Sequence, residues 1–254
     1  MARNLWTRDE MILALSLYFR LPFGRLNHIT PEVKKLAKLI GRTDNSVALR
    51  LVNYAACDPY ILATGRHGMA QGASVCKPYW EEFANDKERL FFEAKQIEAR
   101  LLQQPIEEVL AIEPSQLEGK ERLAVVKQRI GQDAFHDMIL ANYNIRCAVT
   151  GIDIPTMLAA GHIIPWSVSE EHRLDPENGI CLSPLYHEAF DQGFISLDDQ
   201  YCILLAPKLK EYAKRDYYDQ HFASLEHRRI LLPDEHSPNH EYLEWHRDVV
   251  FNKD

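Results

Sequence analysis

Helix start and stop signals follow one another closely through the first 60 residues, so this part of the chain can form only short helices. Thr7 and Glu10 have the spacing of a capping box, in which each side chain binds a backbone N–H at the start of a helix. The apolar residues that follow recur at helical spacing and predict a helix over roughly 8–20. Pro22 and Gly24 then interrupt the pattern, because neither residue continues a helix well.

Two further helices are predicted by signals of the same kind. Pro31 follows Thr30 and suits the first turn of a helix, where its missing N–H is harmless. Gly41 ends this second helix, and after a short turn Thr43 or Asp44 caps a third one. The sequence therefore predicts a three-helix unit with a tight turn before its last helix.

This arrangement is typical of a helix-turn-helix, whose last helix enters the major groove of DNA and reads base edges. Residues 60–78 contain three glycines and are a candidate for the wing of a winged-helix variant. The same pattern also fits a helical protein-interaction module whose outward face is simply solvated. If the unit binds DNA, the side chains expected to contact it are Arg42, Asn45, Ser46, Arg50, Asn53 and Arg66.

The distribution of charge favours the DNA-binding interpretation. The protein carries a formal net charge of -8 at pH 7, which alone argues against a polyanionic partner. However, residues 1–60 contain nine Lys and Arg against five Asp and Glu, whereas the remainder contains 20 against 32. A basic segment on an acidic body is expected when one small domain meets a polyanion and another does something else.

A charged stretch over 79–104 carries an apolar stripe at helical spacing and predicts one long helix, which Pro105 ends. This stripe is long enough to serve as a dimer helix, but it fits equally well a helix packed against the N-terminal unit. Residues 105–120 are acidic and lack a sustained period, which indicates a linker. The apolar stripe consists of Trp80, Phe83, Leu90, Phe91, Ala94, Ile97 and Leu101.

Composition and cysteine usage indicate a globular protein in a reducing compartment. The 254 residues are 46% hydrophobic and 26% charged, which is enough material for one or two domains. No apolar run approaches the roughly 20 residues of a membrane span, and the N-terminus is charged where a secretory signal would be apolar. The five cysteines include no CxxC pair, which argues against disulfides and against a four-thiolate zinc site. We therefore expect a soluble cytoplasmic protein with no membrane partner.

The second half of the chain contains a diagnostic series of motifs. In order, they are CAVTG at 147–151, HIIPW at 162–166, Asn-Gly at 178–179 and HEAFD at 187–191. This series resembles that of HNH endonucleases, specifically a bacterial branch, and the resemblance covers about 129–207 closely. Because several anchored elements occur in order, the match is far more specific than three isolated residues would be.

The resemblance implies an α+β protein with a ββα-metal nuclease domain, preceded by the mainly helical, winged-helix-like unit. The first strand is expected to end near His162, and the loop between the strands to span roughly 166–178. The second strand then covers 180–183, and a helix begins near Pro184 or Leu185, where a proline suits the first turn. The expected domains are a DNA-binding domain at 1–75, a helical connector and linker at 76–119, and a nuclease domain at 120–254.

The resemblance also assigns roles to individual residues. His162 matches the first histidine of the family and is expected to be the general base, since an imidazole accepts a proton from water at neutral pH. Asn178 is expected to pin the loop and, as in some members, to touch the metal. His187 is expected to bind the metal from the helix, and Asp191, four residues later on the same helical face, is a second candidate ligand.

The expected cofactor is a divalent cation, Mg²⁺ or Mn²⁺, because mixed oxygen and imidazole ligation suits phosphoryl chemistry. Many HNH enzymes place a metal ligand directly before the first histidine, where this chain has Gly161. A structural zinc is not expected, since Cys147 and Cys181 are single cysteines. Arg173 lies in the loop between the strands, where it either contacts a DNA phosphate or is a solvated loop charge.

These features predict a metal-dependent endonuclease acting on double-stranded DNA in a bacterial cytoplasm, for restriction of or defence against foreign or modified DNA. A homodimer is expected on DNA, because one HNH site breaks one strand and helix-turn-helix proteins commonly read two half-sites. Gly161 keeps open a DNA-binding regulator whose nuclease fold has lost activity. A scaffold whose N-terminal helices bind protein is a third, more remote alternative.

Overall fold

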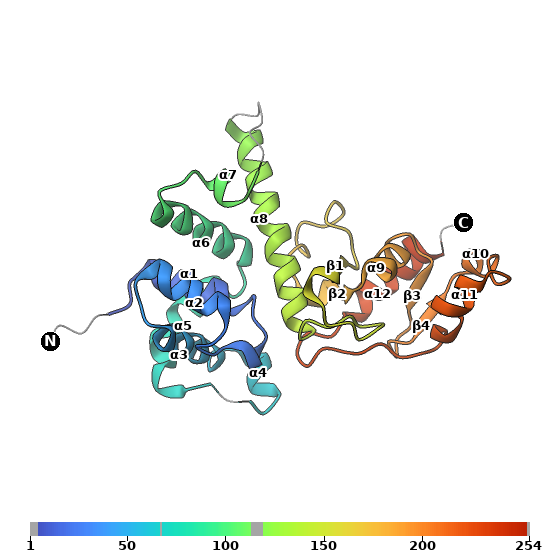
Figure 1. Cartoon of the computed structure of the whole chain (residues 1–254), viewed down its shortest axis with the longest axis horizontal. Coiled ribbons are helices and arrows are strands. Elements are labelled where there is room, and N and C mark those ends of the chain that lie inside the picture. Colours follow the sequence, from blue (N-terminus) through green and yellow to red (C-terminus); the bar gives the residue numbers. More distant parts are fainter. Residues whose placement is uncertain (1–4, 67, 113–118, 253–254) are drawn as a thin grey trace. The chain divides into compact units, whose positions relative to one another are not determined.

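The computed structural model describes residues 5–66, 68–112 and 119–252 (Figure 1). The fold is α+β and separates into two compact units, Met1–Met138 and Ile139–Asp254. The boundaries predicted at 75 and 119 both lie inside the first unit. Residue 75 is within the helix Ala70–Phe83, and residue 119 begins the helix Gly119–Asn142. No helix in the described part of the chain is long and apolar enough to cross a membrane.

The first unit begins with the three predicted helices, α1 (Arg8–Tyr18), α2 (Pro31–Ile40) and α3 (Asp44–Ala55). Both hydrogen bonds of the predicted capping box are present at the start of α1, between Thr7 and Glu10. Gly41 ends α2 in the left-handed conformation, with φ of 67°, which glycine adopts without strain. Thr43 caps α3 by accepting a hydrogen bond from the backbone N–H of Ser46. The local signals therefore placed these helices correctly.

The segment proposed as a wing is helical instead. It contains α4 (Pro59–Ala63) and the first part of α5 (Ala70–Phe83), so no strand pair forms among its described residues; His67 lies outside them. The long helix predicted over 79–104 is also wrong, since the chain turns between α5 and α6 (Lys87–Leu102). Asp86 caps α6 through the N–H of Arg89, which explains why a new helix starts there.

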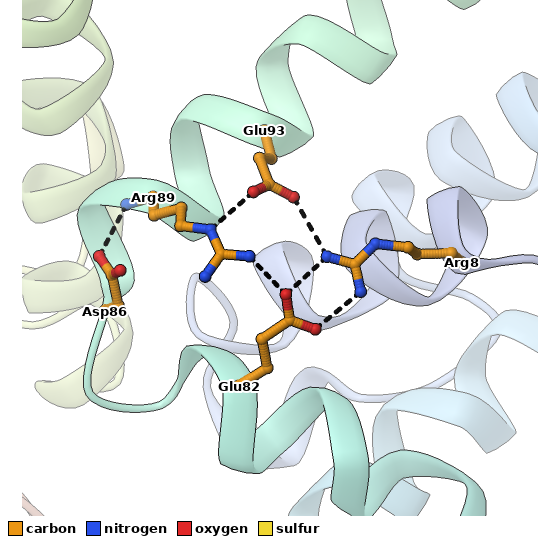
Figure 2. Close-up of polar contacts among 5 residues, drawn as sticks. All are labelled: Arg8, Glu82, Asp86, Arg89 and Glu93. Carbon is orange, nitrogen blue, oxygen red and sulfur yellow. Dashed lines mark hydrogen bonds and ion pairs between the residues drawn. The ribbon is translucent and has the colours of Figure 1, made fainter.

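An ion-pair network joins α5 and α6 to α1 (Figure 2). Glu82 of α5 accepts from both Nη atoms of Arg8, at 2.6 and 2.7 Å, and also from Arg89 of α6. Glu93 accepts from Nε of Arg89 at 2.8 Å and lies 3.5 Å from Arg8. The network thus links the two helices on either side of this turn to each other and to α1.

The apolar stripe of α5 and α6 packs inside the first unit rather than outward. Phe83 and Leu90 are fully buried there, and Trp80 packs against the same core, whose other members come from α1, α2 and α3. Burial of this kind removes the stripe from water within one chain. The stripe therefore provides no surface for the dimer helix considered above, although Leu101 at its end is exposed.

The predicted linker is also partly helical. It contains α7 (Ile106–Val109) and the start of α8 (Gly119–Asn142), a helix that runs through the boundary between the two units. Residues 113–118 of the predicted linker lie outside the described residues.

The second unit is built around two short strands and one helix in the predicted order. Strands β1 (Ala159–His162) and β2 (Gly179–Leu182) are antiparallel, and α9 (Pro184–Asp191) follows directly. His162 pairs with Gly179 in the register of this hairpin, and Gly161 pairs with Ile180. The ββα topology expected from the resemblance is confirmed.

A second antiparallel pair and the C-terminal helices complete this unit. The pair is β3 (Ile195–Leu197) with β4 (Ile203–Leu205), which contacts both α9 and the C-terminal helix. The remaining helices are α10 (Pro207–Lys210), α11 (Asp216–His221) and α12 (His240–His246), and α12 continues into a π turn at Arg247–Phe251. Short 3₁₀ turns occur at Phe23–Arg25, Pro155–Met157, Pro176–Asn178 and Ala223–Leu225.

Candidate active site

The ββα element places His162 and His187 on neighbouring parts of one hairpin and helix. His162 is the last residue of β1, and His187 lies one turn into α9, which begins with Pro184 at its first position. The two imidazoles are near enough for the charge of His187 to depress the pKa of His162. The two elements also pack closely at Gly161, where an added Cβ would lie 3.1 Å from Cδ2 of the His187 ring.

The side chain of Asn178 bonds to backbone groups of the loop between the strands. Its side chain is 1% exposed, and its Oδ1 accepts from the backbone N–H of Ile164 at 2.8 Å. Its Nδ2 donates to the carbonyl oxygens of Ile164 and His172, both at 3.0 Å. Because one buried side chain satisfies three backbone groups, Asn178 holds the two ends of the loop together. Its oxygen is buried and already accepts one hydrogen bond.

The imidazole of His162 is oriented by the loop that Asn178 holds. Its Nε2 lies 3.1 Å from the carbonyl oxygen of Arg173. A carbonyl only accepts, so Nε2 carries the proton in the neutral ring and Nδ1 carries the lone pair. Trp166 packs edge-on at 5.7 Å between ring centroids. Burial is the main cause that lowers the pKa of His162 to about 4, and the nearby His187 lowers it further.

Arg173 therefore contributes through its backbone as well as its side chain. Its guanidinium lies 5.0 Å from the centroid of the Trp166 ring, and Nε donates to the Trp166 carbonyl at 3.0 Å. It also pairs with the exposed Glu170 at 3.5 Å. These contacts keep Arg173 within the loop, and the carbonyl partner it gives to His162 was not foreseen from the sequence.

His187 and Asp191 converge as the helical spacing predicted. Nε2 of His187 lies 3.6 Å from Oδ2 of Asp191, and both side chains are partly exposed, at 29% and 42%. Burial raises the pKa of Asp191, and the neighbouring His187 opposes this shift. The pair therefore presents one nitrogen and one oxygen donor at the open side of the element.

Position 161 adjoins this pair. A Cβ built on Gly161 would lie 3.1 Å from Cδ2 and 3.6 Å from Nε2 of His187. A metal-binding side chain at this position would thus be directed at the same place as His187. Glycine supplies no such ligand here, which matches the departure from the family noted above.

The donor set fits a cation that keeps several ligands from water and substrate. Among the described residues there is no cluster of three or more His, Cys, Asp and Glu that could hold a metal. A single imidazole and a single carboxylate remain, in His187 and Asp191. Mg²⁺ is commonly bound by one or two carboxylates together with waters and substrate phosphates, so these two ligands are compatible with it.

The C-terminal helix α12 supports the loop, a feature that sequence reasoning did not assign. The hydroxyl of Tyr242 donates to Asp175 at 2.9 Å and lies 3.1 Å from Nδ1 of His172. The backbone N–H of Asn239 donates to the Glu177 carbonyl at 3.0 Å. These contacts hold the turn that directly precedes Asn178. The EYLEWH sequence shows only a helical period, so the contact was not visible without the fold.

His246, also on α12, lies beneath α9. Its ring stacks on Phe190 at 3.8 Å, its Nε2 lies 3.0 Å from the Phe190 carbonyl, and its Nδ1 lies 2.9 Å from Oγ of Ser196. Burial is the first cause that lowers its pKa to about 4. His246 is a core histidine that fixes the helix carrying His187.

The two cysteines of this unit that adjoin the hairpin act in packing. Sγ of Cys147 accepts from the backbone N–H groups of Thr150 and Ser183, at 3.4 and 3.2 Å. Cys181 is fully buried in β2. All five cysteines are free thiols.

The residues predicted to read DNA from the first unit are mostly engaged inside it. Arg42 forms a bidentate pair with Glu10, at 2.7 and 2.8 Å, and its side chain is only 9% exposed. Arg50 lies 4.7 Å from the Trp6 ring and 3.6 Å from Sγ of Cys76. The prediction that Asn53 faces outward is wrong, because this side chain is 5% exposed beneath α5.

The other predicted readers are less enclosed. Asn45 is exposed and Ser46 is half-buried at the start of α3. Arg66 lies 5.6 Å from the Phe23 ring. The structure thus brings His162, Asn178, His187 and Asp191 together, whereas the predicted DNA-reading residues do not form one exposed face.

Residues 147–198 match a protein family described as HNH endonuclease. The matched segment spans β1, the loop, β2, α9 and β3, and it contains all four residues of the candidate site. No curated protein matches the chain. The second unit therefore contains an HNH domain. This domain supports a nuclease function, which is the hydrolysis of nucleic acid.

Proposed function

We propose that the protein is a metal-dependent endonuclease that hydrolyses phosphodiester bonds of double-stranded DNA, in restriction of or defence against foreign or modified DNA. The observation that carries this proposal is the orientation of His162. Its Nε2 is committed to the Arg173 carbonyl, so Nδ1 is the nitrogen that accepts a proton. Its lowered pKa keeps the ring neutral at pH 7 and therefore able to act as a base.

His162 takes a proton from water as the water oxygen attacks phosphorus and the bond to the leaving oxygen breaks. The leaving alkoxide then takes up a proton from solvent. The negative charge of a bound phosphodiester stabilises the protonated imidazole, which brings its pKa toward the working pH. Asn178 keeps the loop closed so that the Arg173 carbonyl remains in place during this transfer.

His187 and Asp191 would hold the divalent cation, Mg²⁺ or Mn²⁺. When bound, such a cation neutralises charge on the phosphate and the leaving oxygen. Water and the phosphate itself would complete its coordination, since the chain offers only two ligands here. One such site breaks one strand, so cutting both strands requires two turnovers or two subunits; a homodimer on DNA remains part of the proposal.

Cleavage of supercoiled plasmid in Mg²⁺ or Mn²⁺ tests the proposal. The wild-type protein is expected to produce nicked or linear DNA. His162→Ala is expected to lower the rate by about 10² to 10⁴ through loss of the general base, with DNA affinity nearly unchanged. His28→Ala is the matched control, since His28 is an exposed histidine of the first unit. Wild-type rates in His162→Ala would remove this residue from the mechanism.

The metal ligands are tested by calorimetric titration of Mn²⁺. His187→Ala is expected to weaken Mn²⁺ binding, and raised Mn²⁺ is expected to restore part of its lost cleavage. Asp191→Ala is expected to behave likewise. Wild-type Mn²⁺ affinity in both variants would refute this pair as the metal site.

A DNA-binding regulator that has lost nuclease activity is the second candidate. The absence of a side chain at Gly161, next to His187, favours it, because the site lacks a ligand that many HNH enzymes have. Wild-type protein that binds duplex DNA but leaves plasmid intact in both metals would establish this alternative over the first.

A further inference from the structure

The charge of the HNH-containing unit makes it a poor ligand for a polyanion by itself. Residues 139–254 contain ten Lys and Arg against nineteen Asp and Glu. Nucleic-acid binding depends largely on cations that neutralise phosphates. A protein that acts on DNA with such a unit therefore needs a basic surface elsewhere, and the first unit carries the other 19 Lys and Arg.

Helix α3, the expected reading helix, offers little such surface. It contacts α1, α2 and α5. The close packing of α5 is visible at Gly72, where an added Cβ would lie 2.1 Å from Nδ2 of Asn53. Leu49 and Asn45 form its exposed strip, and neither carries a charge. The second half of α3 is covered.

The arginines of the first unit are largely neutralised by carboxylates. Figure 2 shows two of them, Arg8 and Arg89, each bonded to Glu82 and close to Glu93. An arginine paired with two carboxylates attracts a phosphate only weakly, because the carboxylates cancel its positive charge. Further pairs of this kind are Arg25 with Glu32, Arg42 with Glu10, Arg100 with Asp9, and Arg122 with Glu107.

Helix α2 carries lysines that are not neutralised in this way. Lys34, Lys35 and Lys38 are all exposed, and Lys35 has a side chain that is 81% exposed. Among the residues that the structure describes, neither Lys34 nor Lys38 has an ion-pair partner. Lys35 has only a long contact, 3.9 Å, with Glu98.

We infer that this lysine face of α2, formed by Lys34, Lys35 and Lys38, binds the phosphate backbone of duplex DNA. Residues at i, i+1 and i+4 lie within about 100° of one another around a helix, so the three side chains share one face. They span about 6 Å along the helix axis, and long flexible side chains can reach successive phosphates from there. Flexible ammonium groups suit backbone contacts that carry no sequence information.

The inference rests on the proposed function only in taking DNA as the partner. It assigns to α2 the contact with DNA that the sequence pattern had assigned to α3. Val33, Leu36 and Ala37 of the same helix are buried, so the lysine face is the side of α2 that remains available to a partner.

Binding of the full-length protein to a fluorescent 20-base-pair duplex tests the inference, with EDTA present to prevent cleavage. The variant replaces Lys34, Lys35 and Lys38 by Gln. The matched control replaces Lys77, Lys120 and Lys127 by Gln, which removes the same charge from exposed positions of the same unit. A third variant replaces the α2 lysines by Arg and so keeps their charge.

The α2 Gln variant is expected to lose about ten-fold or more in affinity, and its plot of log affinity against log salt is expected to become shallower by about 3. The control and the Arg variant are expected to bind like wild type. Equal binding by the α2 Gln variant and the control, or equal wild-type affinity for duplex and polyglutamate, would overturn the inference. Wild type that binds through α2 without cleaving plasmid would leave this surface standing and refute the nuclease proposal.

Discussion

Tyr242 of α12 donates its hydroxyl to the carboxylate of Asp175, 2.9 Å away, and thereby ties the C-terminal helix to the loop that orients His162. The same hydroxyl lies 3.1 Å from Nδ1 of His172, whose carbonyl accepts from Asn178. Burial first, and then Asp175, raise the pKa of Tyr242, so the phenol stays protonated and continues to donate. Hydrogen bonds thus connect Tyr242 of α12 to Asn178 through His172.

Tyr242→Phe should therefore weaken catalysis without preventing folding. It removes hydrogen bonds worth about 1 kcal/mol each and leaves the packed ring in place. We expect kcat for plasmid cleavage to fall about ten-fold with KM nearly unchanged, because the base rather than the DNA grip is disturbed. Tyr217→Phe, at an exposed tyrosine of α11, is the control and should cleave like wild type. Equal kcat in the two variants would show that α12 does not position the loop.

Asn178→Asp separates the two roles expected for Asn178. The substitution keeps an acceptor for the Ile164 N–H but turns the two donations toward the Ile164 and His172 carbonyls into repulsive contacts. If Asn178 pins the loop, the variant should be destabilised by about 2 kcal/mol or more, because buried carbonyls lose their donors. If Asn178 binds the metal, a carboxylate should instead strengthen Mn²⁺ binding. Thermal unfolding and calorimetric Mn²⁺ titration distinguish the two outcomes.

The parts of the fold and site that depend on local signals could be predicted from the sequence. The cap at Thr7, the stop at Gly41 and the start of α9 at Pro184 are set by residues within one turn of each boundary. His187 and Asp191 lie side by side because residues four apart share one face of a helix, which the sequence alone predicts.

The missed features depend on partners distant in sequence. Arg42 and Arg50 look like DNA readers until Glu10 and Trp6 are seen beside them, 32 or more residues away along the chain. Asn53 is buried because α5 folds back over α3. Periodicity shows which residues share a face, but it does not show which neighbour covers that face.

Gly161→Asp should strengthen metal binding at the site. The new side chain would start 3.1 Å from Cδ2 of His187, so that ring must shift by a few tenths of an ångström, and its carboxylate would then lie next to the existing pair. A third ligand is expected to raise Mn²⁺ affinity about ten-fold or more, in line with the effect of single groups around a metal. Gly161→Ala introduces the same Cβ without a ligand and should not raise the affinity. Unchanged Mn²⁺ affinity in Gly161→Asp would place the metal away from His187.

Stability should fall as the pH is lowered from about 6.5 to about 4, because His162 and His246 are buried as neutral rings. Burial lowers the pKa of each to about 4, whereas a histidine in the unfolded chain has a pKa near 6.5. Between these values the unfolded chain binds more protons, so acid favours unfolding; below both values no further loss occurs. A shift of this size amounts to about 3 kcal/mol for each histidine.

His246→Gln tests this pH dependence, since Gln does not titrate. In urea unfolding between pH 4 and pH 7.5, the slope of the free energy of unfolding against pH should be smaller in the variant than in the wild type by nearly one proton. The baseline stability of the variant is expected to be lower, because the ring stacked on Phe190 is lost, but the slope is independent of that baseline. Tyr217→Phe serves again as the control and should keep the wild-type slope. An unchanged slope in His246→Gln would mean that His246 does not titrate differently in the folded and unfolded protein.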